Sequence, residues 1–73
     1  MKKEEFFKKM ADAVEIEEQV DENTILADLE EWDSLAAVTT LALFKKHLNM
    51  NITADNLRNC KTIGDILNLG VYE

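Results

Sequence analysis

The sequence contains no proline, two glycines and one cysteine. The lone Cys60 excludes an internal disulfide, and together with the lack of a signal peptide it predicts a reducing, cytoplasmic setting. No apolar run approaches the roughly 20 residues that a membrane-spanning helix needs. With 73 residues we expect one domain, residues 1–73, that is too small to hold a catalytic cleft beside a substrate domain. An enzyme is therefore not expected.

Basic residues are missing from one long segment. Residues 15–33 hold nine carboxylates and no Lys or Arg, and the net charge of the chain is −7. Charge of this sign argues against nucleic acid and anionic membranes as partners, and it favours proteins with basic docking patches. A solvated acidic loop that keeps a small protein soluble explains most of these carboxylates equally well. We expect a monomer.

Metal and nucleophile sites are not predicted. The acidic stretch DENTILADLEEW, which starts at Asp21, has the length of an EF-hand loop but not its pattern. Ile25 and Leu26 stand where a ligand and the glycine belong, and Trp32 replaces the bidentate glutamate. Cys60 is expected to be a small buried apolar residue, since it and His47 match no catalytic signature.

Helical periodicity dominates the rest of the chain. Residues 3–15 are predicted to form a helix whose apolar face carries Phe6, Phe7, Met10 and Val14. Residues 16–33 lack a sustained period and are predicted to form a long connection. This loop is expected to reach the core through Ile16, Val20, Ile25, Leu26 and Leu29. Loops of this length are uncommon in compact domains and are often functional.

Three further helices are expected after the loop. Residues 34–48 have a broad apolar face, with Ala37, Leu41, Phe44 and Leu48 widened by Leu35, Val38 and Ala42. Thr53 can cap a short helix that reaches Leu57, and Thr62 with Asp65 resembles a capping box. The last helix carries Ile63, Ile66 and Leu67 and stops near Gly70. The predicted fold is an all-α four-helix bundle with three main helices, a short third helix and a long first loop.

Ser34, in the stretch LEEWDSLAAV, is open to two interpretations. A serine before an apolar helix is usually an N-cap, although Asp33 can also cap and Ala37 stands where a capping box needs Glu or Gln. The other interpretation makes Ser34 the carrier of a phosphodiester, because a helix N-terminus favours a phosphate. Residue chemistry alone does not separate the two.

The chain resembles the acyl carrier protein family. The likeness rests on DSL at residues 33–35 opening an amphipathic helix after a long loop, followed by FKKHL, ITADNL and KTIGDIL. The resemblance implies that Ser34 is esterified with 4'-phosphopantetheine, taken from coenzyme A by a Mg²⁺-dependent phosphopantetheinyl transferase. The thiol of that arm holds acyl or aminoacyl groups as thioesters for separate partner enzymes, including a loading ligase.

The resemblance also implies roles for the residues near Ser34. Asp33 and Leu35 are expected to help partner enzymes recognise the site, and residues 34–48 are expected to form the main docking surface. Other candidate docking residues are Trp32, Ala36, Val38 and Thr39. If the cargo is an acyl chain, a cleft between the second and third helices could shelter it, with Leu41, Leu57 and Ile63 as candidate walls.

Two features depart from the carriers of fatty-acid synthesis. Trp32 replaces a small residue before DSL, which looks like specialised stand-alone carriers, including D-alanyl carriers; it can equally be a clamp that fixes the loop. Residues 34–48 contain no carboxylate, so the usual salt bridges to basic partners are missing. A specialised pathway is therefore expected. The alternative is an unmodified acidic interaction domain in which Ser34 is only an N-cap.

Overall fold

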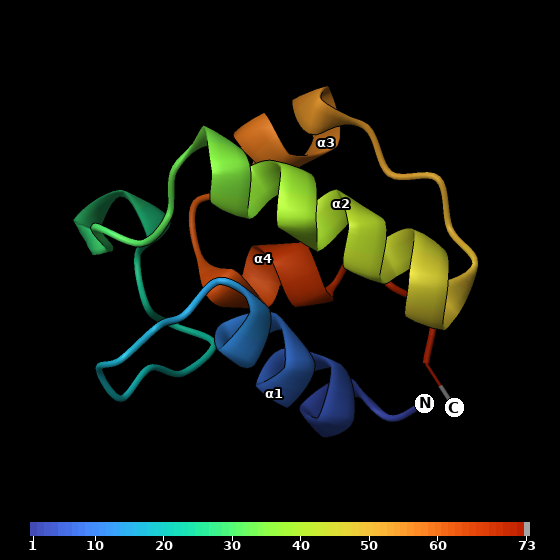
Figure 1. Cartoon of the computed structure of the whole chain (residues 1–73), viewed down its shortest axis with the longest axis horizontal. Helices are drawn as coiled ribbons and strands as arrows, with labels where there is room; N and C mark the ends of the chain where they lie inside the picture. The colour runs from blue at the N-terminus through green and yellow to red at the C-terminus, as the bar shows by residue number, and fades with distance from the viewer. Residues whose placement is uncertain (73) are drawn as a thin grey trace.

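The computed structural model describes residues 1–72. In chain order its elements are α1 (Lys3–Ala13), the 3₁₀ turn η1 (Leu26–Asp28), α2 (Ser34–Leu48), α3 (Ala54–Arg58) and α4 (Ile63–Leu67). α1 packs directly against both α2 and α4, and in Figure 1 α3 lies on the side of α2 away from α1. The described residues contain no strand beyond an isolated bridge between Ile25 and Thr62. The predicted all-α, four-helix fold with a long first loop is confirmed.

The core forms where all four helices and the loop meet. Phe6 of α1 packs against Phe44 of α2 with 4.7 Å between ring centroids and a tilt of 49°. The other residues buried in this cluster are Met10, Leu26, Leu29, Leu57, Ile63, Ile66 and Leu67. Each helix therefore contributes an apolar side chain to one shared centre, as a domain of this size requires. Among the described residues, no helix is long and apolar enough to cross a membrane.

The face that α2 buries differs from the predicted one. Its buried residues are Ala36, Thr40 and Phe44, spaced by four. Thr40 is fully buried because its hydroxyl donates a 2.9 Å hydrogen bond to the Ala36 carbonyl oxygen. The prediction that Leu35, Val38 and Ala42 widen the buried face is wrong, since all three residues are exposed, Leu35 to 74% and Val38 to 60%. Thr40 takes the inward position, and these three aliphatic residues lie on the outward side.

Two helices are shorter than predicted. α1 ends at Ala13, and Glu15 then adopts a positive φ of 57° that a right-handed helix does not allow. α4 has five residues, the same length as α3, so it is not a third main helix. Both short helices begin with a capping box: Thr53 with Asn56, and Thr62 with Asp65 as predicted. Each box satisfies backbone N–H groups that a helix start otherwise leaves without partners.

The long loop is fixed to the start of α4 by main-chain hydrogen bonds. The N–H of Leu26 donates to the Lys61 carbonyl at 2.9 Å, and the N–H of Gly64 donates to the Glu22 carbonyl at 2.8 Å. A salt bridge of 2.7 Å between Lys3 Nζ and Glu22 Oε1 adds α1 to this contact. Leu26 and Leu29 are buried as predicted. These contacts determine where the chain enters α2.

Gly64 is required for this close approach. A Cβ atom at Gly64 would lie 2.9 Å from the carbonyl oxygen of Glu22, which belongs to the backbone and cannot rotate away. We expect Gly64→Ala to lower the free energy of unfolding by about 1–3 kcal/mol, the usual cost of overpacking, despite the higher helix propensity of alanine. Urea unfolding followed by circular dichroism measures this change. A variant as stable as the parent would contradict the close packing.

The only tyrosine provides a test of packing near the C-terminus. The Tyr72 hydroxyl donates a 2.7 Å hydrogen bond to the Leu67 carbonyl, and burial raises the pKa of Tyr72 to about 12. Burial favours the neutral phenol, so Tyr72 stabilises the folded state as long as it stays protonated. This stabilisation is complete below the unfolded pKa of about 10 and is lost as the pH rises towards 12.

Ultraviolet absorbance titration of the folded protein should show tyrosinate forming with a midpoint near 12. The same titration in concentrated urea should give about 10. Tyr72→Phe should remove the stability change over this pH range. A midpoint near 10 in the folded protein would contradict the buried contact.

Candidate functional site

Ser34 lies at the first position of α2, where the acidic loop ends. The loop reaches this point through η1 and the buried Leu29, whose carbonyl accepts a 3.2 Å hydrogen bond from the Trp32 N–H. Leu29 therefore holds the backbone of Trp32, two residues before the serine. The side chain of Ser34 is exposed, so a second protein can reach its hydroxyl.

Asp33, rather than Ser34, is the N-cap of α2. Its backbone is extended, and Asp33 Oδ1 accepts a 2.9 Å hydrogen bond from the Ala36 N–H. The Ser34 hydroxyl makes no hydrogen bond to the rest of the described chain. The interpretation of Ser34 as the N-cap is therefore wrong. The aspartate performs that function and leaves the hydroxyl available for other chemistry.

The start of α2 suits a phosphate at this position. The first N–H groups of a helix lack internal acceptors, and the helix dipole adds partial positive charge there. Asp33 Oδ1 uses the Ala36 N–H, and the first turn of α2 contains no acidic residue. The N–H groups of Ser34 and Leu35 precede the first internal bond of the helix. A phosphodiester on Ser34 Oγ fits this environment.

The predicted docking residues separate into two groups. Leu35 and Val38 are exposed, and Trp32 and Thr39 are half-buried at the same end of α2. Ala36 is 4% exposed. The prediction that Ala36 belongs to a docking surface is wrong, because its side chain lies on the buried face one turn before Thr40.

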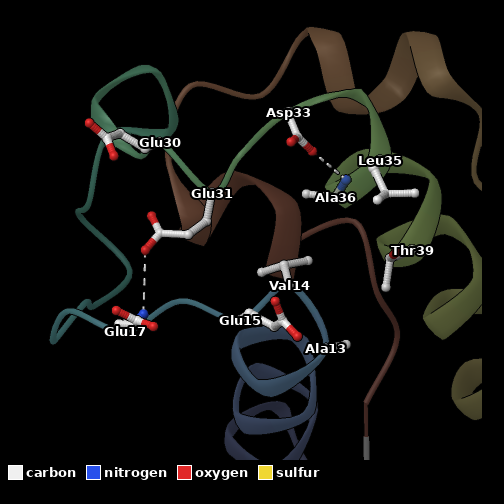
Figure 2. A pocket seen from close by; sticks show the side chains of 10 residues that line it. All are labelled: Ala13, Val14, Glu15, Glu17, Glu30, Glu31, Asp33, Leu35, Ala36 and Thr39. Atoms are coloured by element: carbon white, nitrogen blue, oxygen red, sulfur yellow. Dashed lines mark hydrogen bonds between the residues drawn. The ribbon is translucent and has the colours of Figure 1, made fainter.

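A pocket of about 540 Å³ opens between the end of α1, the loop and α2. Figure 2 shows its carboxylates, which come from both sides of the opening: Glu15, Glu17, Glu30, Glu31 and Asp33. Leu35 and Thr39 line its α2 wall. α2 itself has no acidic residue, and the carboxylates beside its first turns come from the segment that precedes it.

Glu31 links the two sides of this pocket. Its Oε2 accepts a 3.4 Å hydrogen bond from the Glu17 N–H, and its Oε1 is buried with no hydrogen-bond partner among the described residues. The nearby backbone N–H of Glu31 itself is the main influence that lowers the pKa of its carboxyl, and the Glu17 N–H acts in the same direction. No group of three or more His, Cys, Asp or Glu within residues 1–72 could hold a metal ion.

A second opening of about 360 Å³, the α2–α3 cleft, includes Ser34 itself in its wall. Its lining residues are Trp32, Asp33, Ser34, Ala37, Val38, Leu41, Ala54, Leu57 and Arg58. Leu41 and Leu57, two of the three predicted walls of an acyl cleft, are among them. Ile63 is 0% exposed and does not line the cleft, so its predicted place in the wall is wrong. Its side chain is part of the core beneath.

Arg58 is a cleft residue that the sequence pattern does not predict. α3 has only five residues, too few for apolar periodicity to show which side faces α2. One available signal was composition, because Arg58 is the only arginine and Trp32 the only tryptophan of the chain. Both line the cleft that contains Ser34.

A model of one protein family, described as the phosphopantetheine attachment site, matches residues 5–69. The matched segment runs from α1 through α4 and includes both openings beside Ser34. Searches of the curated proteins and of the solved structures each gave no significant match.

The assignment of the cap can be tested with two neighbouring variants. Asp33→Ala removes the acceptor for the Ala36 N–H and should lower the free energy of unfolding by about 0.5–2 kcal/mol. Ser34→Ala removes an exposed hydroxyl and should change it by less than about 0.5 kcal/mol. Urea unfolding of both variants measures the difference. The reverse order of the two effects would make Ser34 the cap after all.

Proposed function

The chain belongs to the phosphopantetheine attachment site family, and on this premise we propose that Ser34 is the residue that carries the arm. Members of the family bear 4'-phosphopantetheine as a covalent group. The observation that supports this assignment is that Ser34 is exposed while the neighbouring Asp33 caps α2, so the serine hydroxyl is not used as the cap.

The attachment reaction needs little from the chain beyond an accessible hydroxyl. Ser34 Oγ loses its proton and forms an O–P bond with the phosphorus next to pantetheine in coenzyme A. The pyrophosphate bond breaks, and adenosine bisphosphate leaves. The Mg²⁺ and the proton acceptor belong to the phosphopantetheinyl transferase. Asp33 and Leu35, on either side of the serine, present it to that enzyme.

The function that follows is transport of a bound cargo. The thiol at the end of the arm supplies thioester chemistry, and the cargo is an acyl or aminoacyl group that a ligase loads. The chain catalyses no step of its own. Leu41 and Leu57, in the wall of the α2–α3 cleft, provide apolar surface that can shelter a cargo beside Ser34.

Docking of the partner enzymes is proposed to combine apolar contact with charge. Leu35 and Val38 are exposed beside Ser34, and Trp32 and Thr39 flank them. Because α2 has no acidic residue and ends in Lys45, Lys46 and His47, the negative charge that meets a basic partner comes from the loop. A specialised pathway, rather than housekeeping fatty-acid synthesis, is consistent with this arrangement. We further propose a cytoplasmic monomer.

Intact mass spectrometry tests the attachment directly. The purified protein is incubated with coenzyme A, Mg²⁺ and a phosphopantetheinyl transferase of broad specificity. We expect the parent to gain the mass of one phosphopantetheinyl group and Ser34→Ala to gain none. Because Ser34→Ala leaves the cap on Asp33 intact, it should remain folded, and circular dichroism confirms this in the same samples.

Lys61→Gln is a control, since it alters an exposed side chain that lines neither opening beside Ser34. It should be modified to the same extent as the parent. No mass gain in the folded parent, with a known carrier modified in the same tube, would reject the proposal. The acidic interaction domain would then be the better interpretation of the exposed Leu35 and Val38.

A further inference from the structure

We propose that Arg58 holds the phosphodiester of the arm on Ser34 and thereby directs the arm into the α2–α3 cleft. Arg58 is a positioning residue in this proposal, since it contacts the arm and takes no part in thioester chemistry. The proposal rests on the proposed function, because it requires a phosphodiester on Ser34. It adds a specific binding contact within this chain.

Arg58 and Ser34 belong to the wall of the same cleft. α3 follows α2 after a turn and runs back towards the start of α2, so the last turn of α3 lies at the serine end of that helix (Figure 1). Arg58 is the last residue of α3, and Leu57 before it is buried against the core. The buried leucine fixes the backbone from which the arginine side chain extends.

The charges in the cleft favour this contact. A phosphodiester keeps a negative charge at neutral pH, and the segment that precedes Ser34 holds nine carboxylates and no basic residue. Among the described residues that line the cleft, only Asp33 and Arg58 are charged, and the carboxylate of Asp33 would repel a phosphate. Within this described lining, the offsetting charge therefore comes from Arg58.

The guanidinium of Arg58 is available for a new partner. It forms an ion pair of 3.0 Å with Asp55 Oδ1, and the two side chains are 78% and 83% exposed. Such exposed pairs contribute little to stability. A guanidinium presents two parallel N–H groups to a phosphate, and these charge-assisted hydrogen bonds are stronger than neutral ones. The Arg58 guanidinium can therefore leave the Asp55 carboxylate and bind the phosphodiester at little cost in stability.

The remaining cleft wall suits the part of the arm that follows the phosphate. Trp32, Val38, Leu41 and Leu57 present apolar surface, which matches the dimethyl group and methylene units of pantetheine. Leu57 is 3% exposed and belongs to the buried core cluster, so the cleft is closed towards the interior at this residue. The arm then lies along the surface between the two helices instead of entering the bundle.

The composition of the chain makes the contact easy to observe by NMR. The single arginine and the single tryptophan each give one side-chain N–H signal in a ¹⁵N–¹H spectrum: Nε–H of Arg58 and Nε1–H of Trp32. The phosphodiester gives one ³¹P signal. Spectra are recorded before and after modification, and intact mass confirms in the same sample that one arm is attached.

We expect the Arg58 Nε–H and Trp32 Nε1–H signals to shift on modification. The ³¹P signal of the modified parent should differ from its position in urea. Arg58→Gln should move it to the urea position, whereas Arg58→Lys should retain part of the displacement. Lys61→Gln is the matched control, because it removes the same charge from an exposed residue that does not line the cleft, and it should leave the signal unchanged.

Asp55→Asn provides a second test that leaves the arginine in place. It removes the competing carboxylate and should increase the ³¹P displacement. A modified parent with an unshifted Arg58 signal, or equal effects of Arg58→Gln and Lys61→Gln, would overturn the arm contact and leave the carrier function intact. Failure of the parent to gain an arm would overturn the proposed function, and this inference with it.

Discussion

The hydrogen bond from the Ala36 N–H to Asp33 Oδ1 determines the chemistry available at the start of α2. It satisfies one of the N–H groups that the start of a helix leaves without a partner. A serine side chain often accepts such a bond, and here Asp33 does so in place of Ser34. The adjacent Ser34 hydroxyl is consequently exposed and makes no hydrogen bond within residues 1–72. The bond also fixes the first turn, so Leu35 and Val38 face outward on the same end of the helix as Ser34. The site thus depends on a division of tasks between two neighbouring residues.

Charge is divided along α2 in a similar way. The serine end is surrounded by carboxylates of the segment between α1 and α2, and the last turn carries Lys45, Lys46 and His47. Desolvation, with repulsion from Lys9 and Lys46, lowers the pKa of His47, so the lysines supply most of the positive charge there at neutral pH. A partner with a basic active-site rim is attracted to the serine end and repelled from the other. The field can therefore orient the protein before any contact forms.

Much of the fold could be predicted because charged residues stand on either side of the apolar ones in the sequence, so the buried face of a helix is visible as a period. Phe6 and Met10 stand among Glu and Lys, and the Thr62–Asp65 box is visible as a motif. The inner face of α2 could not be read in this way, because apolar residues occur nearly all around it and the buried Thr40 is polar. Helical periodicity also does not reveal that Glu22 approaches Gly64, a contact between residues far apart in the chain. Arg58 was missed for the related reason that α3 is too short to show a face.

The main-chain contacts that hold the loop against α4 have a consequence for when the site forms. The segment that leads into Ser34 is fixed by Lys61, Thr62 and Gly64, which leave the ribosome well after the serine does. Contacts between such distant residues require closure of a long loop, which costs chain entropy, and they cannot form before α4 has been synthesised. A nascent chain that ends before α4 exposes the serine in a segment without this support. Recognition by a modifying enzyme that reads the folded shape would thereby be confined to chains that have completed α4.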